Sequence, residues 1–239
     1  MSRFRITPSV IPNLFTAMNM FCGFLSIINA SQGQYFYAAS LIIIAAVFDA
    51  LDGMMARLTH SSSELGVELD SLSDLVSFGA AHAFLIYQTQ LISYNSFGVV
   101  ISSLLMIAGG FRLARFNVQL VGFEKSHFTG LPIPSSAITI AAFVITYYQK
   151  GIGFQPPFSY VTIPLVITLS LLMVSTIKYD TLPKFTLSGI KEKPAYFGFI
   201  IVAAILIIAT KGNALFFIFV FLILFGIFRH IFYMLAKKF

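Results

Sequence analysis

Long apolar runs, separated by short polar breaks, follow one another along almost the whole chain. An apolar run of about 18 residues can cross a bilayer as a helix, and the strict apolar–polar alternation of barrel strands does not occur in these runs. The pattern therefore predicts an all-α polytopic membrane helix bundle with about eight transmembrane helices. These lie at about residues 12–30, 35–57, 66–91, 97–117, 134–149, 158–177, 195–210 and 214–236.

The breaks between the runs carry the turn residues Gly, Pro, Asn and Ser, as in "NASQGQ" after the first run and "KGN" before the last. The longest polar connection spans residues 178–194. We expect one integral-membrane domain over residues 1–239. Within it, a six-helix core over about residues 8–177 precedes a C-terminal helical hairpin over about residues 195–236.

Composition supports a membrane protein and argues against a soluble domain. Hydrophobic residues make up 58% of the chain and charged residues only 10%, against roughly 25% charged in soluble domains. The single cysteine, Cys22, excludes an internal disulfide. The net charge of +6 indicates attraction to anionic lipid headgroups, and no aromatic-rich basic segment suggests a nucleic-acid partner.

Lysine and arginine predict the orientation, because they stay on the cytoplasmic side of short loops. With the N-terminus inside, thirteen basic residues fall on the cytoplasmic side, and only Lys150 and Lys211 fall outside. We therefore expect a multi-pass protein of the cytoplasmic (inner) membrane with both termini in the cytoplasm. A cleaved signal peptide is a weaker interpretation of the first run, because Pro12 and Asn13 open it.

Six of the nine acidic residues fall within one stretch of 26 positions. Asp49 and Asp52 are three apart at the cytoplasmic end of the second predicted helix, so they share a helix face. Gly66, Asp70 and Asp74 recur every four residues where the third predicted helix enters the membrane. The two helices form a hairpin around "LTHSSSEL", and we expect its faces to bring the four carboxylates together.

Four neighbouring carboxylates in a low dielectric require positive compensation, and a divalent metal supplies it. Oxygen ligands favour Mg²⁺, Mn²⁺ or Ca²⁺, and a four-carboxylate set fits two ions that act on a phosphoryl group. Gly53, Ala56 and Gly66 would leave room for a bulky phosphorylated substrate, and Arg57 would pair with its phosphate oxygens.

Carboxylates in a membrane would also serve a cation or proton transporter. Such a protein needs a polar path to the opposite membrane face. The segments 35–48 and 75–91 contain few charged groups, which favours an enzyme whose site opens to the cytoplasm.

The acidic stretch reads D-x-x-D-G-x-x-A-R, eight residues, then G-x-x-x-D-x-x-x-D. It resembles the signature of the CDP-alcohol phosphotransferases at every fixed position. The resemblance implies a reaction in which a CDP-linked lipid or alcohol is joined to a second alcohol and CMP is released, with Mg²⁺ or Mn²⁺ as cofactor. The matching residues are Asp49, Asp52, Gly53, Ala56, Arg57, Gly66, Asp70 and Asp74.

Three further segments are similar to the bacterial and archaeal membrane phosphatidylserine synthases of that family: "PSVIPNLFTAMNMFCGFLSI", "GGFRLARFNV" and "FTGLPIPSSA". The resemblance covers about residues 8–140. It implies CDP-diacylglycerol as donor, L-serine as acceptor, membrane lipid as surroundings and a homodimer as assembly. A relative that uses glycerol 3-phosphate or inositol phosphate is the alternative.

The resemblance also implies roles for individual residues. Asp49, Asp52 and Asp70 would hold metal, and Asp74 would both contact metal and deprotonate the serine hydroxyl. The residues expected on the CDP and phosphate side are Asn13, Asp52, Gly53, Ala56, Arg57 and Gly66.

Three of the candidate residues keep a second interpretation. Asn13 is either a helix cap or a phosphate contact. Arg112 and Arg115, close together at the cytoplasmic end of the fourth predicted helix, either anchor that helix or receive the serine carboxylate or the lipid phosphate.

Overall fold

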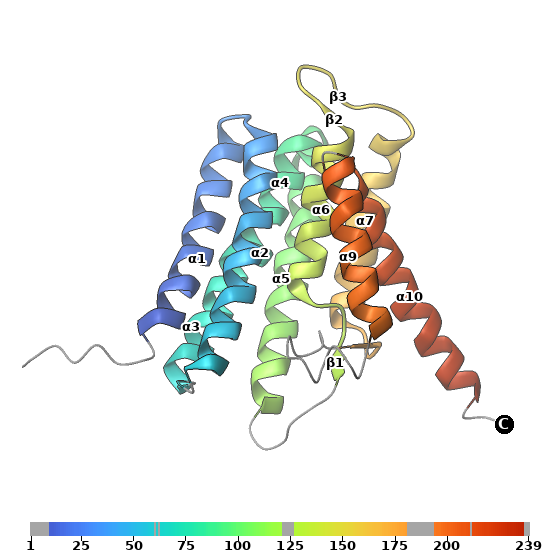
Figure 1. Ribbon diagram of the computed structural model, residues 1–239. Coiled ribbons are helices and arrows are strands. Elements are labelled where there is room, and N and C mark those ends of the chain that lie inside the picture. Colours follow the sequence, from blue (N-terminus) through green and yellow to red (C-terminus); the bar gives the residue numbers. More distant parts are fainter. Residues whose placement is uncertain are drawn as a thin grey trace, which may run out of the picture.

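The computed structural model describes residues 10–59, 61, 63–120, 127–180, 194–210 and 212–236 of the 239. Over these residues the protein is a bundle of long helices (Figure 1). The helices are α1 (Val10–Ser31), α2 (Tyr35–Leu58), α3 (Glu64–Asp74), the π-helix η1 (Leu75–Ala80), α4 (Ala81–Thr89), the 3₁₀-helix η2 (Leu91–Tyr94), α5 (Asn95–Leu120), α6 (Ile133–Tyr147), α7 (Phe158–Val174), α9 (Pro194–Ala209) and α10 (Ala214–Ala236).

Two short strand pairs lie at opposite ends of the bundle (Figure 1). Strand β1 (His127–Thr129) pairs antiparallel with β4 (Lys178–Asp180), so the segment before α6 is tied to the segment after α7. Strand β2 (Tyr148–Gln149) pairs antiparallel with β3 (Gly153–Phe154) at the other end.

The predicted all-α membrane bundle is confirmed, and each predicted apolar run contains a helix. Among the described residues, five segments are long and apolar enough to cross a membrane: Val10–Ser31, Tyr35–Leu58, Glu64–Thr89, Leu91–Val118 and Ala214–Ala236. The other three apolar helices have 10 to 17 residues: Ile133–Tyr147, Phe158–Val174 and Gly198–Ala209.

Local chemistry explains the two turns that form the first three helices into hairpins. Gly33 has φ +73, a left-handed conformation that glycine adopts without strain, and it reverses the chain between α1 and α2. Ser63 caps α3, because its hydroxyl accepts a hydrogen bond of 3.0 Å from the main-chain N–H of Gly66. The cap fixes where the third span begins.

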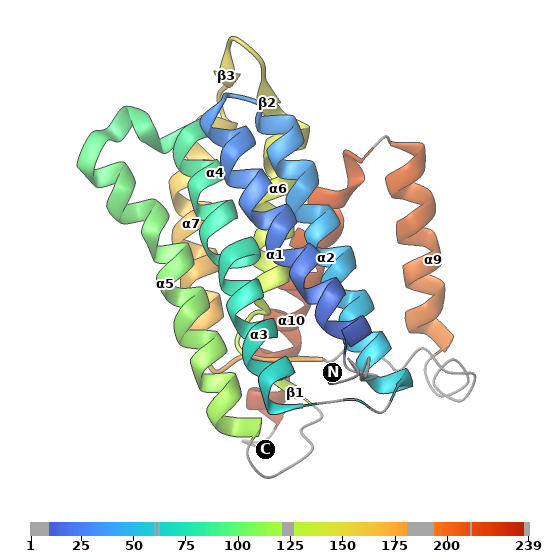
Figure 2. The same ribbon diagram turned by 90° about the vertical axis from the view of Figure 1, so that its left-hand side faces the viewer.

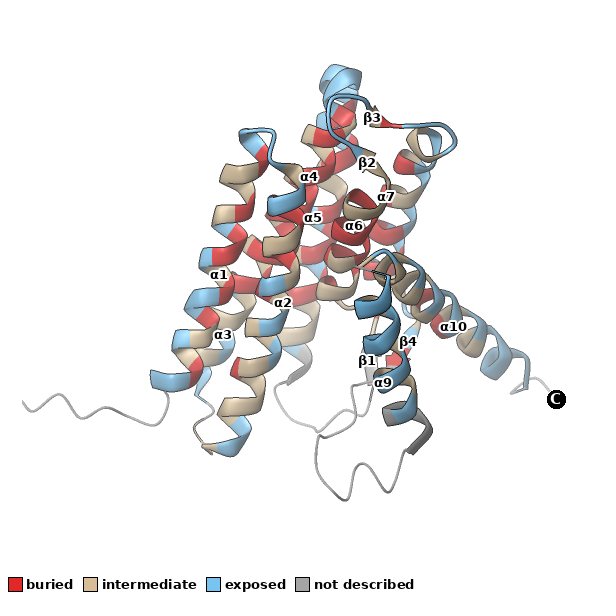
Figure 3. Ribbon diagram, turned by 45° about the horizontal axis from the view of Figure 1, so that its top comes forward, coloured by how far each residue is buried: buried red, intermediate tan, exposed pale blue. Residues whose placement is uncertain are grey.

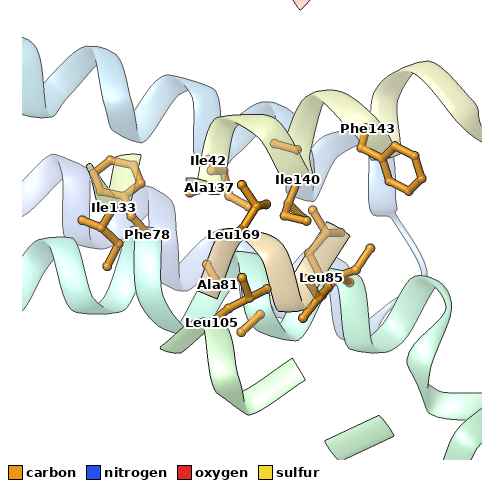
Figure 4. Close-up of a cluster of buried hydrophobic side chains, with 14 of the residues drawn as sticks. Ile42, Phe78, Ala81, Leu85, Leu105, Ile133, Ala137, Ile140, Phe143 and Leu169 are labelled. Atoms are coloured by element: carbon orange, nitrogen blue, oxygen red, sulfur yellow. The ribbon is translucent and has the colours of Figure 1, made fainter. Parts of the chain in front are cut away.

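The core lies where α6 packs between α2, α4 and α7 (Figure 4). Ile42, Phe78, Leu85, Ile140 and Leu169 come from five different helical segments and are almost fully buried together. The outward faces carry exposed residues instead, as Figure 3 shows, and many of these are large hydrophobic side chains. An apolar exterior on a helix bundle is typical of contact with lipid.

Helix α9 stands apart from the bundle and packs mainly on α10, which in turn packs on α6 and β4 (Figure 2). The division into a six-helix core and a C-terminal hairpin remains a prediction. Helix α1 begins, α2 ends, α3 begins and α10 ends at the same face of the bundle, the lower one in Figure 1. The acidic hairpin of α2 and α3 closes at this face.

Candidate active site

The acidic residues of α2 and α3 meet near the lower face of the bundle. One carboxylate oxygen each from Asp49, Asp70 and Asp74 lies within 4.8 Å of the others. Asp74 is 7% exposed, and the other two carboxyl groups are half-buried. The structure therefore gathers three of the four predicted metal ligands from two facing helices.

Asp52 stands outside this group of three, although it interacts electrostatically with Asp49 and Asp70. It is 6% exposed and also interacts with Thr16 of α1. Its Oδ2 atom has no hydrogen-bond partner among the described residues. A ligand role for Asp52 stays a prediction.

Helix α1 forms the back of the cluster through hydrogen bonds that the sequence interpretation missed. The hydroxyl of Ser73 donates to the Thr16 carbonyl at 3.0 Å, and that of Ser77 donates to the Asn19 carbonyl at 2.8 Å. The Asn19 side chain is fully buried, and its Nδ2 donates to Oδ1 of Asp74 at 3.4 Å. An asparagine and two serines within apolar spans were the available signal.

The sequence predicted one continuous helix over residues 66–91. The structure instead divides this span into α3, η1 and α4. Directly after Asp74 the backbone widens into the π-helix η1, and the N–H of Ala81 bonds to the carbonyl of Val76, five residues back. π-Segments occur often at functional sites. A Cβ on Gly23 of α1 would come within 2.9 Å of three Ser77 atoms, so α1 approaches η1 closely enough to require glycine there.

The small residues of the signature lie next to the predicted phosphate-contacting groups. A Cβ on Gly66 would lie 3.5 Å from Oδ1 of Asn13, which brings the starts of α1 and α3 together. A Cβ on Gly53 would lie 3.5 Å from a guanidinium nitrogen of Arg57, which is exposed. Ala56 is half-buried on the same helix. A phosphate role for these residues is not tested by this arrangement.

The two arginines of α5 have different surroundings. Arg112 is 6% exposed, interacts electrostatically with Asp49 and Asp74, and lies over the ring of Phe116 at 5.8 Å. Arg115 instead binds main-chain carbonyls around the end of α7. Its Nη1 donates to Val174 at 2.9 Å, and its Nη2 lies 2.8 Å from Thr129 O, 3.1 Å from Met173 O and 3.2 Å from Ser175 O.

A second polar link joins α5 to α3 beside the cluster. Ser71, the neighbour of Asp70, exchanges hydrogen bonds with the Asn117 side chain at 2.9 and 3.2 Å. The α5 end is therefore fixed to the acidic hairpin on one side and, through Arg115, to α7 on the other.

The donor set fits a hard divalent cation. Three carboxylate oxygens converge, and the buried Oδ1 of Asp70 lacks a hydrogen-bond partner in the part of the chain that the structure describes. A cation would satisfy these oxygens and offset charge that Arg112 alone cannot balance.

Comparison with known proteins agrees with this geometry. The family model described as CDP-alcohol phosphatidyltransferase matches residues 9–177. A CDP-diacylglycerol–serine O-phosphatidyltransferase of Helicobacter pylori is 35% identical over 179 residues, 73% of this chain and 73% of the relative. An archaetidylserine synthase of Methanothermobacter thermautotrophicus is 39% identical over 171 residues, 71% of this chain and 69% of the relative.

A solved structure shares the fold. The phosphatidylinositol phosphate synthase of Mycobacterium tuberculosis, crystallised with CDP-DAG bound, superposes with a TM-score of 0.53 at 20% identity and covers 72% of this chain and 84% of its own. The acidic signature, the helical bundle and the family match over most of the chain lead to one conclusion: this protein belongs to the CDP-alcohol phosphatidyltransferase family.

Proposed function

We propose that this protein transfers the phosphatidyl group of CDP-diacylglycerol to the hydroxyl of L-serine and releases CMP. The observation that carries the proposal is the meeting of Asp49, Asp70 and Asp74 at one face of a membrane bundle. The donor is supported by the fold shared with a protein crystallised with CDP-DAG, and the acceptor by relatives named as serine phosphatidyltransferases.

The cofactor in this proposal is Mg²⁺ or Mn²⁺, as two ions. Asp49, Asp70 and Asp74 would hold it, with Asp52 as a further ligand on the α1 side. Bound there, such cations would supply charge stabilisation for the pyrophosphate and for the departing CMP.

Asp74 is the proposed base, because it is the most buried of the three clustered carboxylates and is held by Asn19. It takes the proton of the serine hydroxyl as the serine oxygen forms a bond to the phosphorus that carries diacylglycerol. The bond from that phosphorus to the oxygen bridging it to CMP breaks, and CMP leaves with the electron pair. The lipid tails stay in the bilayer throughout.

The remaining residues bind and orient the two substrates. Asn13, Gly53, Ala56, Arg57 and Gly66 would contact the CDP and phosphate groups near the ends of α1, α2 and α3. Arg112 would receive the serine carboxylate, since it is the buried cation next to Asp49 and Asp74.

Arg115 is less available than Arg112 for a substrate contact, because both of its terminal nitrogens already bind main-chain carbonyls.

We also propose that the acidic face is cytoplasmic, in the inner membrane, with both termini on that side. The lysine and arginine bias of the sequence supports this orientation. A homodimer is the proposed assembly, by resemblance to the family.

The acceptor can be tested directly. Purified protein is incubated with CDP-diacylglycerol, Mn²⁺ and labelled serine, glycerol 3-phosphate or inositol phosphate, and lipid product and CMP are measured. We expect product from serine alone. Product from one of the phosphorylated alcohols would identify that alcohol, and not serine, as the acceptor. Cation flux without CMP release would favour a transporter.

A further inference from the structure

Asn19 of α1 donates a side-chain hydrogen bond to Asp74, one of the three clustered carboxylates. It is fully buried in the middle of a membrane-spanning helix. Its Nδ2 points to Asp74, while its Oδ1 has no hydrogen-bond partner among the described residues. Asn19 is not one of the residues of the acidic signature, which lies in α2 and α3.

Packing alone does not account for an asparagine at this place. A buried amide oxygen without a donor destabilises a fold, whereas leucine, of similar size and shape, has no such oxygen to leave unsatisfied. Unpaired buried polar groups are rare, and in membrane spans they concentrate at functional positions. The residue therefore has a role that apolar packing would not fill.

The backbone around Asn19 is held rigidly against the acidic span. Its own carbonyl accepts from Ser77, and the Thr16 carbonyl one turn earlier accepts from Ser73. These two contacts flank Asp74 in sequence. The amide is thus presented to Asp74 from a fixed helix, and the freedom left to it is rotation of its side chain.

Asp74 needs such a partner because its other neighbours are charged. Asp49 and Asp70 repel its carboxylate, Arg112 attracts it, and Asp49 also shares a side-chain hydrogen bond with it. A neutral amide donor holds one oxygen in place without neutralising the group, which leaves the second oxygen for metal or for the substrate proton. The 3.4 Å separation is long, as is common for catalytic hydrogen bonds before substrate binds.

We propose that Asn19 is a positioning residue that orients the carboxylate of Asp74 through its side-chain N–H. The inference rests on the proposed role of Asp74 as base and metal ligand. It adds a residue from α1, outside the signature of α2 and α3, to the machinery of the reaction.

Asn19→Leu tests the proposal, since it keeps the volume and removes both polar ends. We expect kcat to fall by about 10- to 100-fold, the usual effect of losing a partner that orients a metal ligand. We expect the KM for CDP-diacylglycerol to stay within about threefold and the melting temperature to be no lower than that of the unsubstituted protein. Ser26→Ala is the matched control.

Ser26 is also fully buried on α1, but its hydroxyl donates to the Ala38 carbonyl of α2, away from the cluster. Its substitution should leave kcat within about twofold even if the protein melts earlier, because the contact it loses is far from reacting groups. A kcat of Asn19→Leu within twofold of the unsubstituted protein would overturn the proposal. A loss of kcat that only follows a lowered melting temperature, as in an unstable variant, would overturn it too.

A separate measurement keeps this inference distinct from the choice of acceptor. Mn²⁺ binding to the purified protein without CDP-lipid, followed by electron paramagnetic resonance, does not depend on serine. If the unsubstituted protein does not use serine, a roughly tenfold rise in the Mn²⁺ dissociation constant of Asn19→Leu still supports the positioning role. An unchanged dissociation constant would then overturn it.

Discussion

Replacing Arg115 should destabilise the protein without weakening serine binding, whereas replacing Arg112 should weaken serine binding. In the structure Arg115 ties the end of α5 to Thr129, Met173, Val174 and Ser175 through their carbonyl oxygens. Gly130 lies against this contact with φ +83, and a Cβ there would come within 2.6 Å of the guanidinium. The arginine therefore links α5 to β1 and to the end of α7 through hydrogen bonds.

The size of the effect follows from the number of donors. Four carbonyl contacts are shared by two guanidinium nitrogens, so they are not four independent bonds. A hydrogen bond to a charged group contributes about 1.5–3 kcal/mol, and partial exposure reduces this, so we expect Arg115→Ala to cost about 2–4 kcal/mol. For a chain of this length that corresponds to a melting temperature lower by about 4–16 °C.

The assay compares Arg115→Ala, Arg115→Lys and Arg112→Ala in detergent micelles, by thermal unfolding and by serine kinetics. Arg115→Lys should recover only part of the stability, because an ammonium cannot span the same carbonyls as the planar guanidinium. Arg112→Ala should raise the serine KM by about 30-fold or more, since a buried charge-assisted pair lost on one side is worth roughly 2–5 kcal/mol.

A selective rise in the serine KM of Arg115→Lys, with an unchanged melting temperature, would refute this reasoning. Arg115 would then bind substrate, as one interpretation of the sequence held. An unchanged serine KM in Arg112→Ala would leave the acceptor carboxylate without its proposed partner.

Three further predictions concern the cluster and its support. Asp49→Asn should lower turnover by at least about 100-fold and weaken Mn²⁺ binding, whereas the exposed Glu64→Gln should leave both unchanged; a fully active Asp49→Asn in chelator-treated buffer would contradict the site. Asp74→Asn should still bind CDP-diacylglycerol by calorimetry while CMP release falls by about 10²- to 10⁴-fold, and normal turnover would exclude Asp74 as the base. Gly23→Ala should destabilise the protein by about 1–3 kcal/mol, against no loss for Gly198→Ala, which has open space; equal melting temperatures would mean that α1 and η1 move apart freely.

Hydropathy predicted the helices well because each span must satisfy its backbone internally and so reads as one apolar run. It did not predict η1, since a pattern of 3.6 residues per turn looks the same with a π-segment inside it. The π-segment lies where Ser77 packs against Gly23 and bonds to the Asn19 carbonyl. Those contacts join positions more than fifty apart, which no local pattern contains.

The acidic signature does not indicate Asn19, because the signature lies in α2 and α3 alone. A signal existed in α1: Thr16, Asn19 and Ser26 are polar residues within an otherwise apolar span, spaced so that they fall near one helix face. Polar groups at membrane depth are costly, so their presence indicated a partner across the helix interface. For Asn19 the structure identifies that partner as the span that carries Asp74, whereas the Ser26 hydroxyl bonds to the Ala38 carbonyl of α2.

The position of Asp52 follows from the same helix geometry that predicted the cluster. Each residue of an α-helix turns the chain by about 100° around the axis. A spacing of four on α3 therefore leaves Asp70 and Asp74 about 40° apart. A spacing of three on α2 leaves Asp49 and Asp52 about 60° apart, in the opposite direction of rotation. Asp49 can therefore face the pair on α3 while Asp52 turns toward Thr16 of α1. Two helices and two spacings thus produce an asymmetric site, with three oxygens converging on one point and a fourth carboxylate offset toward α1.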